Sequence, residues 1–462
     1  RLYFDPLNPE SVDNIIATEK PDACVVQFGG QTAIKLAKAV REAGYSILGT
    51  DLGDIDAAED RELFNELLTR LGIPQPKGTT VFTADEAAEA AAELGYPVLV
   101  RPSYVLGGQG MEIAYDEKHI REYMSIINMN VQEHPILVDK YLLGREIEVD
   151  AICDGENVLI PGIMEHIERA GIHSGDSISV YPSFSLPEAV KEKILEYTRV
   201  LGLGIGIVGL YNIQFIVDQE QRVYVIEVNP RSSRTVPFLS KSTGWSLADI
   251  GTRVILGQSL RDQGIDRLYP PEKKRWYVKA PAFSFSKLQG LDAYLSPEMK
   301  STGEAIGYDD RLTRALYKAL QASGMHVTNY GTVFVTVADR DKEEALPLVR
   351  RFYRMGFNIQ ATEGTARFLK ANGIRTQSLG KIHGGSQEIF ESIRAGFVNY
   401  VINTQDPGDA KGLADGRAMR QVAVQNNVTM FTSLDTVRVL LDVLEETAIG
   451  VSTIDASPGG SA

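Results

Sequence analysis

Residues 96–110 constrain the fold more than any other part of this chain. Their sequence, YPVLVRPSYVLGGQG, begins with apolar β-forming residues that end at Arg101 and continues into a loop with three glycines. Glycines let backbone N–H groups approach an anion closely, and a cation at a strand end neutralises phosphate charge. An ordinary strand with a glycine turn would have the same sequence pattern. Alone, the segment therefore predicts a strand and leaves two interpretations of the loop.

A second segment, with the sequence VIEVNPR, supplies what a phosphate loop needs next. Residues two apart on a strand point to the same face, so Glu227 and Asn229 should lie side by side. Gln214, on the strand predicted to pair with this one, can add a third oxygen, and Mg²⁺ prefers oxygen ligands. Arg231 and Arg234 follow and can stabilise charge on a phosphoryl group. The two segments together predict a clamp for a metal ion and a triphosphate.

Composition limits the class of protein. The chain has 462 residues, 44% of them hydrophobic, which is enough for roughly three domains. A net charge of -14 argues against nucleic acid as the main partner, since phosphate backbones need a basic surface. With only two cysteines, Cys24 and Cys153, the composition argues against a disulfide framework and fits a reducing cytoplasm. We find neither an apolar run of membrane-spanning length nor a signal peptide, so no membrane is expected.

The order of predicted elements indicates a multidomain chain of α/β and α+β type. Residues 10–55 alternate helices with a buried strand over 23–28, which is typical of a doubly wound parallel sheet. Between about 60 and 325, paired strands around a polar turn at 218–221 indicate an α+β domain. Beyond residue 329 the βα alternation resumes and predicts a small Rossmann-like module. The tail over 457–461 is expected to be disordered.

The two motifs, at 96–110 and 226–231, resemble the signature motifs of the carbamoyl phosphate synthase large subunit. Nearly the whole chain resembles the C-terminal half of that subunit. The resemblance implies a pre-ATP-grasp Rossmann-like domain over 1–57, an ATP-grasp domain with its C-terminal extension over 58–325, and a methylglyoxal-synthase-like allosteric domain over 326–462. Because Arg1 is not an initiator methionine and the chain opens inside a strand pattern, we expect the first domain to be N-terminally truncated.

The resemblance implies ATP-dependent phosphorylation of carbamate to carbamoyl phosphate, with ATP and Mg²⁺ or Mn²⁺ as cofactors, in pyrimidine and arginine biosynthesis. It also implies the N-terminal half of the large subunit and a glutaminase small subunit as partners, a cytoplasmic location and an oligomer. Two alternatives stay open. The chain could be another ATP-grasp carboxylate ligase, or a nucleotide-binding regulatory fragment that is inactive on its own.

The resemblance also assigns site residues. The implied catalytic residues are Arg101, Asn229, Arg231 and Arg234, and the implied metal ligands are Gln214, Glu227 and Asn229. The implied nucleotide-binding residues are Arg61, Arg101, Glu146, Gly171, Ile172, His173, Ser174, Gln214 and Glu227. A packed or capping role is an equal alternative for His173. Gln109 stands where relatives often carry arginine, which removes a positive charge from the loop.

In the C-terminal module the resemblance implies an anion site for a nucleoside monophosphate, with ornithine as another effector of the family. Hydroxyl, amide and ammonium groups at strand ends are the groups that such a ligand needs. The implied allosteric residues are Lys342, Thr362, Thr365, Lys381, Asn403 and Thr404. Gln405 replaces a second threonine seen in some relatives.

Overall fold

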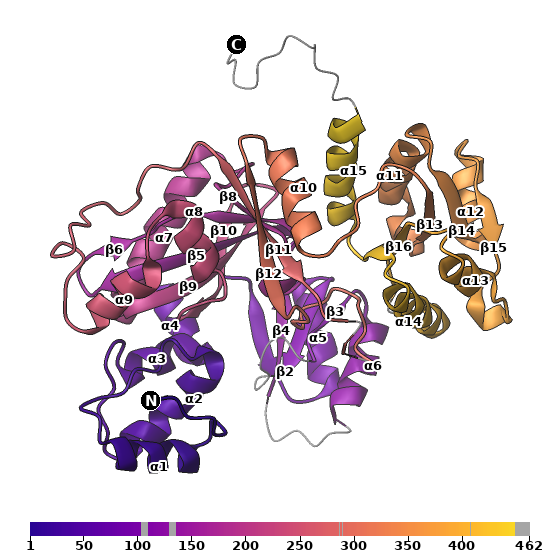
Figure 1. The fold of residues 1–462 in the computed structure, drawn as a ribbon. Helices are drawn as coiled ribbons and strands as arrows, with labels where there is room; N and C mark the ends of the chain where they lie inside the picture. The colour runs from indigo at the N-terminus through magenta and orange to yellow at the C-terminus, as the bar shows by residue number, and fades with distance from the viewer. Residues whose placement is uncertain (103–109, 129–134, 286, 289, 407, 449–462) are drawn as a thin grey trace, which may run out of the picture. The chain divides into compact units, whose positions relative to one another are not determined.

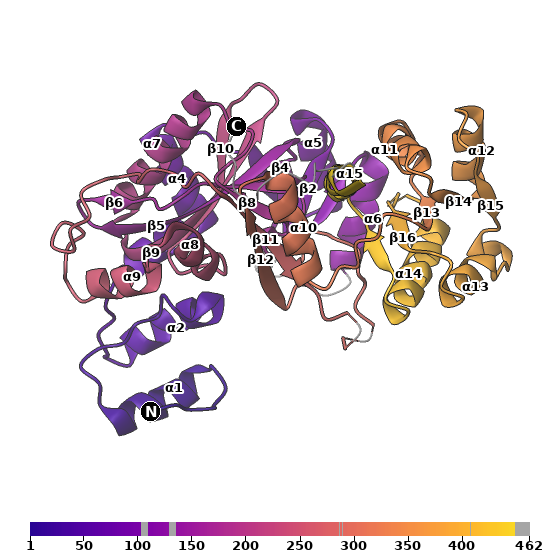
Figure 2. The same ribbon diagram turned by 45° about the horizontal axis from the view of Figure 1, so that its top comes forward.

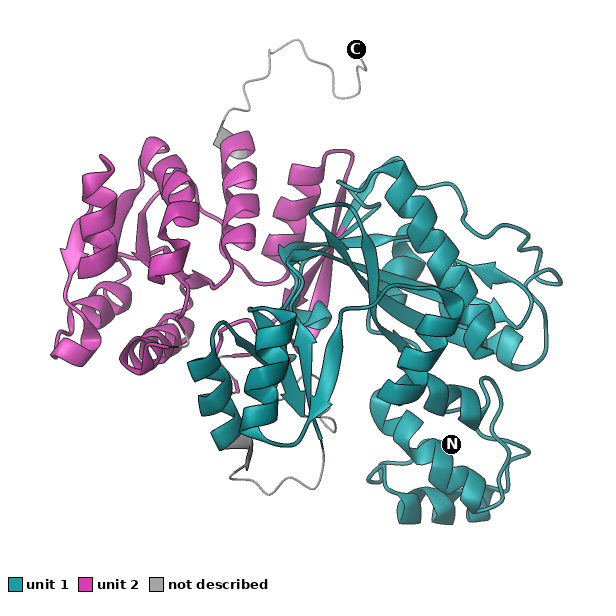
Figure 3. Cartoon of the chain, turned by 180° about the vertical axis from the view of Figure 1, so that it is seen from behind, with its two compact units in different colours: residues 1–277, 297–299 teal, residues 278–296, 300–462 magenta. Residues whose placement is uncertain are grey.

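A computed structural model describes residues 1–102, 110–128, 135–285, 287–288, 290–406 and 408–448. The chain forms two compact units, of which unit 1 comprises residues 1–277 and 297–299, and unit 2 comprises 278–296 and 300–462 (Figure 3). Most of the predicted glycine loop, with Gln109, and the tail over 457–461 lie outside the described residues. In the part of the chain that is described, no helix has both the length and the apolar character that a bilayer crossing requires.

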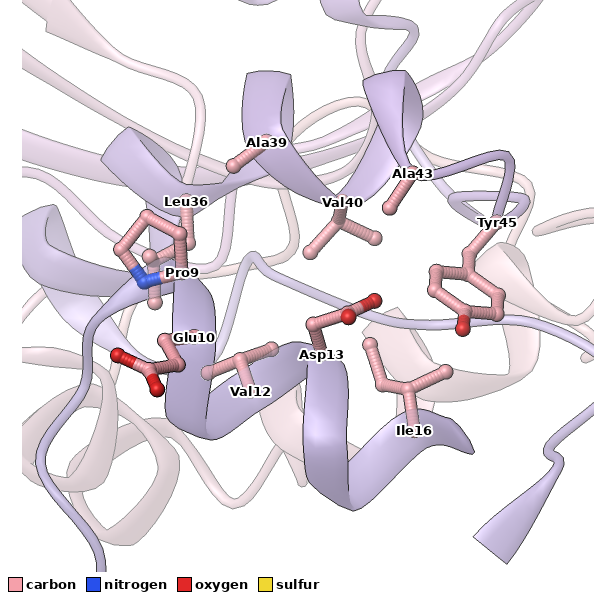
Figure 4. Close-up of a pocket in the computed structure, with 10 residues that line it drawn as sticks. All are labelled: Pro9, Glu10, Val12, Asp13, Ile16, Leu36, Ala39, Val40, Ala43 and Tyr45. Carbon is pink, nitrogen blue, oxygen red and sulfur yellow. The ribbon is translucent and has the colours of Figure 1, made fainter. Parts of the chain in front are cut away.

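Unit 1 begins with the helices α1 (Pro9–Glu19), α2 (Gly30–Glu42) and α3 (Leu52–Glu59). The strand predicted over 23–28 is wrong in extent, because only one isolated parallel bridge forms there, between Cys24 and Ile47. A strand is stabilised by pairing with a neighbouring strand over several residues, and a single bridge does not provide that pairing. The helices α1 and α2 border a mostly apolar cavity of about 280 Å³, lined by Ile16 and Val40 among others (Figure 4).

A small antiparallel sheet follows, with the strand order β1-β4-β2-β3. Its strands are β1 (Gly78–Val81), β2 (Val98–Pro102), β3 (Glu112–Ala114) and β4 (Ile136–Lys140). The helices α5 (Ala84–Leu94) and α6 (Glu117–Asn128) pack on this sheet and complete an apolar core. Thr83 and Glu86 form a capping box at the start of α5, and Gly95 follows the last residue of the helix. Arg101 lies near the end of β2, as predicted.

A larger sheet lies at the centre of unit 1 (Figure 1). Within unit 1 the strand order is β10-β9-β5-β7-β8, with β6 paired to β5. These strands are β5 (Gly144–Asp154), β6 (Val158–Leu159), β7 (Met164–Arg169), β8 (Ser179–Tyr181), β9 (Val208–Asp218) and β10 (Val223–Asn229). The helices α4 (Arg61–Leu71) and α7 (Glu188–Ile205) share a buried core with the sheet. The helices α8 (Val236–Thr243) and α9 (Leu247–Ile255) follow β10.

The strand β11 (Trp276–Ala282) leads from unit 1 into unit 2. Unit 2 continues with β12 (Gly303–Asp309) and α10 (Leu312–Ala322). A parallel five-stranded sheet follows, in the order β15-β14-β13-β16-β17. Its strands are β13 (Thr332–Thr336), β14 (Asn358–Thr362), β15 (Gln377–Leu379), β16 (Tyr400–Asn403) and β17 (Thr429–Phe431).

Helices cover both faces of this parallel sheet (Figure 2). Val333 and Val335 of β13 share a buried core with α11 (Lys342–Arg354), α12 (Glu363–Ala371) and α15 (Leu434–Ala448). Phe334, between them in the strand, points to the other face and packs with α13 (Glu388–Arg394) and α14 (Ala410–Gln425). The predicted Rossmann-like module is therefore confirmed as three layers.

Candidate active site and effector pocket

Three oxygen-bearing side chains meet on the hairpin of β9 and β10. Glu227 is the register partner of Gln214, directly after a shift in the pairing of the two strands. The side-chain amide of Asn229 donates to Glu227 Oε1 at 3.0 Å. The predicted metal ligands are thus neighbours in the structure. A carboxylate with two amide oxygens fits the oxygen donors that Mg²⁺ takes when phosphates complete its shell.

Arg231 joins this group from the end of β10. Its Nη2 donates to Asn229 Oδ1 at 3.0 Å, and its Nε donates to Gln31 Oε1 at 2.9 Å. Gln31 lies in the first turn of α2 and also donates to the carboxylate of Glu59. Burial raises the pKa of Glu59. Gln31 and Glu59 were not predicted as site residues.

Arg61 and Arg101, both predicted to contact phosphate, converge on one buried carboxylate. Arg61 Nη2 lies 3.0 Å from Asp139 Oδ1, and Arg101 Nε lies 3.5 Å from Asp139 Oδ2. Asp139 comes from β4 and is 7% exposed. Burial lowers the pKa of Arg61, and the charge of Asp139 opposes that shift. Asp139 therefore holds two cations from α4 and β2 side by side, a role that the sequence did not reveal.

Residues 171–174 contact β5 and β9 of the larger sheet. The Gly171 N–H donates to Glu146 Oε1 at 3.4 Å, and Gln214 Nε2 donates to Ser174 Oγ at 3.0 Å. His173 caps a short 3-10 turn, η1 (Ser174–Asp176), where its Nδ1 accepts from the Gly175 N–H at 3.0 Å. Burial lowers the pKa of His173, which fits a neutral ring that accepts this bond. Its capping alternative is thus observed, and Ile172 lies beside it in the chain.

Arg234 lies close to the same turn. Its Nη1 donates to Met299 Sδ at 3.0 Å. A Cβ placed on Gly175 would lie 3.1 Å from Arg234 Nη1 and 3.1 Å from Met299 Sδ. The absence of a side chain at Gly175 therefore allows Arg234 to approach the turn.

A buried histidine contacts Glu146, which is one of the residues predicted to bind nucleotide. His166 lies 3.4 Å from Glu146 and 3.3 Å from Glu148, and all three side chains are almost fully buried. Burial lowers the pKa of His166, but the two carboxylates outweigh it and raise the pKa to about 9. Asp150, on the same strand, has its pKa raised to about 7 by burial and by the charge of Glu148. The contact with the buried ring of His166 therefore helps to hold the side chain of Glu146 in place.

The charge of Glu227 influences the pKa values of several of these groups. Burial is the main influence on the pKa values of Glu59, Arg61 and His173, and the charge of Glu227 acts on all three through space. Among the described residues, no cluster of three or more His, Cys, Asp or Glu side chains is arranged to hold a metal ion. A metal here would accordingly depend on Glu227, the two amides and phosphate oxygens.

Unit 2 contains a cavity of about 200 Å³ at the carboxyl ends of its parallel strands. All six residues predicted for the anion site line this cavity, namely Lys342, Thr362, Thr365, Lys381, Asn403 and Thr404. Thr362 is the N-cap residue of α12, so the positive end of that helix dipole lies at the cavity. Lys342 pairs with Asp339 at 2.6 Å, and His383 pairs with Asp415 at 2.7 Å on the lining. The cavity thus combines cationic, hydroxyl and acidic groups.

Three family models match the chain. The carbamoyl phosphate synthase pre-ATP-grasp domain matches residues 1–57, the ATP-binding domain of the carbamoyl-phosphate synthase L chain matches 60–263, and the MGS-like domain matches 344–432. Two of the three models describe carbamoyl phosphate synthase domains, and the three follow in the order that the sequence predicts.

Two solved structures share the fold. Biotin carboxylase of Campylobacter jejuni, solved as a β-γ-ATP complex, is 19% identical, with a TM-score of 0.55 over 68% of this chain and 78% of that one. The biotin carboxylase domain of Hydrogenobacter thermophilus 2-oxoglutarate carboxylase, solved with MgADP, ADP and bicarbonate, is 20% identical, with a TM-score of 0.56 over 70% and 78%. Together with the family models, they show an ATP-grasp ligase fold. The chain has the domain architecture of the C-terminal half of the carbamoyl phosphate synthase large subunit.

Proposed function

We propose that this chain transfers the γ-phosphoryl group of ATP to carbamate, giving carbamoyl phosphate and ADP. The observation that carries the proposal is the hydrogen-bonded set of Glu227, Asn229 and Arg231, with Gln214 opposite, in a chain that also has an MGS-like domain. Biotin carboxylase relatives share the fold but at 19–20% identity, and the large subunit architecture favours carbamate over their substrates.

In this reaction a carbamate oxygen attacks the γ-phosphorus, and the bond from that phosphorus to the β-phosphate oxygen breaks as ADP leaves. The protein needs no nucleophile, because in-line transfer depends on positioning and on charge stabilisation. Glu227, Gln214 and Asn229 would hold Mg²⁺ or Mn²⁺, which neutralises phosphate charge when bound. Arg231 and Arg234 would hold carbamate and the transferring group, while Arg61 and Arg101 would bind phosphates, and Glu146 the ribose.

The same proposal includes regulation and partners. The cavity of unit 2 would bind a nucleoside monophosphate, with Lys342 and Lys381 at its phosphate, and ornithine is a further effector to test. The N-terminal half of the large subunit would deliver carbamate, and a glutaminase subunit would supply ammonia. The protein would act as an oligomer in the cytoplasm, and its product would serve pyrimidine and arginine synthesis.

The reverse reaction tests the proposal on the chain as it is. Purified protein with MgADP and carbamoyl phosphate should form ATP, measured with a luciferase assay. The same protein should show no biotin-dependent ATP hydrolysis with bicarbonate, which separates it from the biotin carboxylases. Binding of MgADP without any ATP formation would overturn the catalytic claim and favour a regulatory nucleotide-binding chain.

A further inference from the structure

One fully buried cation in unit 2 has no part in the proposed chemistry. Arg420 of α14 is 1% exposed and is among the largest side chains that are fully buried in the described structure. A charge without water needs partners that are close and correctly oriented, because removing it from water is unfavourable. The partners of Arg420 divide into two groups.

The first group belongs to the segment 290–296, which precedes β12. Arg420 Nε and Nη2 donate to the two carboxylate oxygens of Asp292 at 2.6 and 2.5 Å. The guanidinium also lies over the ring of Tyr294, 5.3 Å from its centroid. Burial alone would raise the pKa of Asp292, but Arg420 outweighs it and the pKa lies below its usual value. This two-pronged pair fixes the segment with defined geometry.

The second group lines the effector cavity. Arg420 Nη1 donates to Asn403 Oδ1, at the carboxyl end of β16. In the amide orientation that satisfies both partners, the side-chain oxygen of Gln405 accepts from Arg420 as well. Asn403 and Gln405 both line the cavity, whereas Asp292 does not. One guanidinium therefore contacts the cavity wall on one side and the segment 290–296 on the other.

A glycine of α14 keeps the space for this contact. A Cβ on Gly416 would lie 2.9 Å from Arg420 Nη1 and 3.3 Å from Asn403 Oδ1. Both distances are shorter than ordinary carbon contacts, so a side chain at Gly416 would force Arg420 to shift and would crowd Asn403. The fold thus leaves no room at position 416 for a side chain larger than the hydrogen of glycine.

The segment that contacts Arg420 is followed in the chain by a residue that bonds to Arg234, which is predicted to be catalytic. Asp292 precedes Met299 by only a few residues, and Pro297–Met299 belong to unit 1. Met299 Sδ accepts from Arg234 Nη1 at 3.0 Å within that unit. Within unit 2, Leu295 N donates to Thr432 Oγ1 at 3.1 Å and Lys300 Nζ to Ser296 Oγ at 3.0 Å. The stretch from Asp292 to Met299 thus has a hydrogen-bonded partner at each end.

We propose that Arg420 couples occupancy of the unit 2 cavity to the conformation of residues 290–299, by sharing its N–H donors between Asn403 and Asp292. The inference rests on the proposed binding of a nucleoside monophosphate in that cavity. A phosphate-bearing ligand that bonds to Asn403 or Gln405 changes the acceptors available to Arg420, and so changes its hold on Asp292. Coupling of this kind is reciprocal, so the state of Asp292 also acts on the ligand. Arg420 is in this sense a positioning residue.

The test is hydrogen–deuterium exchange of the whole chain with and without uridine 5′-monophosphate, read by mass spectrometry over residues 290–299. In the wild type we expect the ligand to change exchange there by about threefold or more. In Asp292→Asn the ligand should still bind in calorimetry, with an affinity within about fivefold, while the change over 290–299 is lost. Gly416→Ala, which keeps every charge, should lose it too. Glu391→Gln, an exposed carboxylate on α13, should behave as the wild type.

The outcomes separate the two claims. If the ligand does not bind the wild type in calorimetry, effector binding fails, and this inference fails with it. If the ligand binds the wild type but exchange over 290–299 stays the same, only the coupling is wrong. If Asp292→Asn, shown to be folded by its unfolding midpoint, retains the full change, Arg420 plays a structural role alone and the inference is overturned.

Discussion

Glu227 on β10 lies directly opposite Gln214 on β9, next to a shift in the register of the two strands. The shift places a carboxylate and an amide side by side on a hairpin whose strands are rich in apolar residues. Asn229 and Arg231 extend the pair along the strand end. This hairpin is the part of the site on which the metal and the phosphates would depend.

Replacing Gln214 with leucine removes one amide oxygen and leaves every charge in place. We expect the Mg²⁺ concentration for half-maximal ATP formation to rise about tenfold, because the metal loses one of three protein ligands. Gln219→Leu, in the exposed turn of the same hairpin, is the matched control and should leave the Mg²⁺ dependence unchanged. An unchanged Mg²⁺ titration in Gln214→Leu would remove Gln214 from the metal site.

Replacing Asp139 with asparagine removes the carboxylate between Arg61 and Arg101. The two cations would repel each other without it, so we expect the KM for ADP to rise about tenfold and the free energy of unfolding to fall by about 1–3 kcal/mol. Urea unfolding followed by tryptophan fluorescence reports on this part, because both tryptophans, Trp245 and Trp276, lie in unit 1.

The control for Asp139 is Asp85→Asn. Asp85 pairs with Arg121 on the surface, with more than four-fifths of its side chain exposed, and should change neither KM nor stability measurably. If Asp139→Asn matches this control in both measurements, Asp139 does not organise the arginines.

Replacing Gly175 with alanine tests the approach of Arg234. The new Cβ would meet Arg234 Nη1 and Met299 Sδ at 3.1 Å, so the guanidinium must move. We expect kcat for ATP formation to fall about tenfold with little change in the KM for ADP, since the displaced group acts on the transferring phosphoryl. Gly53→Ala, where the nearest atom would be 3.7 Å away, should keep the wild-type kcat. An unaltered kcat in Gly175→Ala would argue against a catalytic Arg234.

His166 makes the stability of unit 1 depend on pH. Its pKa of about 9 lies above the ordinary value of 6.5, so the protonated ring stabilises the folded chain. That contribution is complete below about pH 6.5 and is lost as the pH rises through 9, a change on the order of 3 kcal/mol. We expect His166→Gln to flatten the fall in urea stability between pH 6.5 and 9.5, whereas the exposed His326→Gln should not. Parallel pH curves for wild type and His166→Gln would contradict this.

Local signals in the sequence predicted much of the fold and part of the site. The hairpin of β9 and β10 around the turn at 218–221 is a short-range feature, and it is observed. The residues predicted for the anion site on the strands of unit 2, including Thr362 and Asn403, meet in one cavity because parallel strands end at the same edge of their sheet.

Long-range partners could not be predicted in the same way. Gln31 bonds to Arg231 across 200 residues of sequence, and nothing local in either segment indicates the other. Arg420 is buried and bonds to Asp292, which lies 128 residues away in the sequence. The strand expected over 23–28 lacked a neighbouring ladder, which a single sequence does not show.

The most direct test of the central claim compares two carboxylates of one hairpin. Glu227→Gln and Glu220→Gln are assayed for ATP formation from MgADP and carbamoyl phosphate. Glu220 lies in the exposed turn, where it pairs with Arg222 at 3.1 Å. The account predicts that the wild type and Glu220→Gln form ATP at the same rate and that Glu227→Gln is about 100-fold slower. A Glu227→Gln variant with the wild-type rate would contradict it.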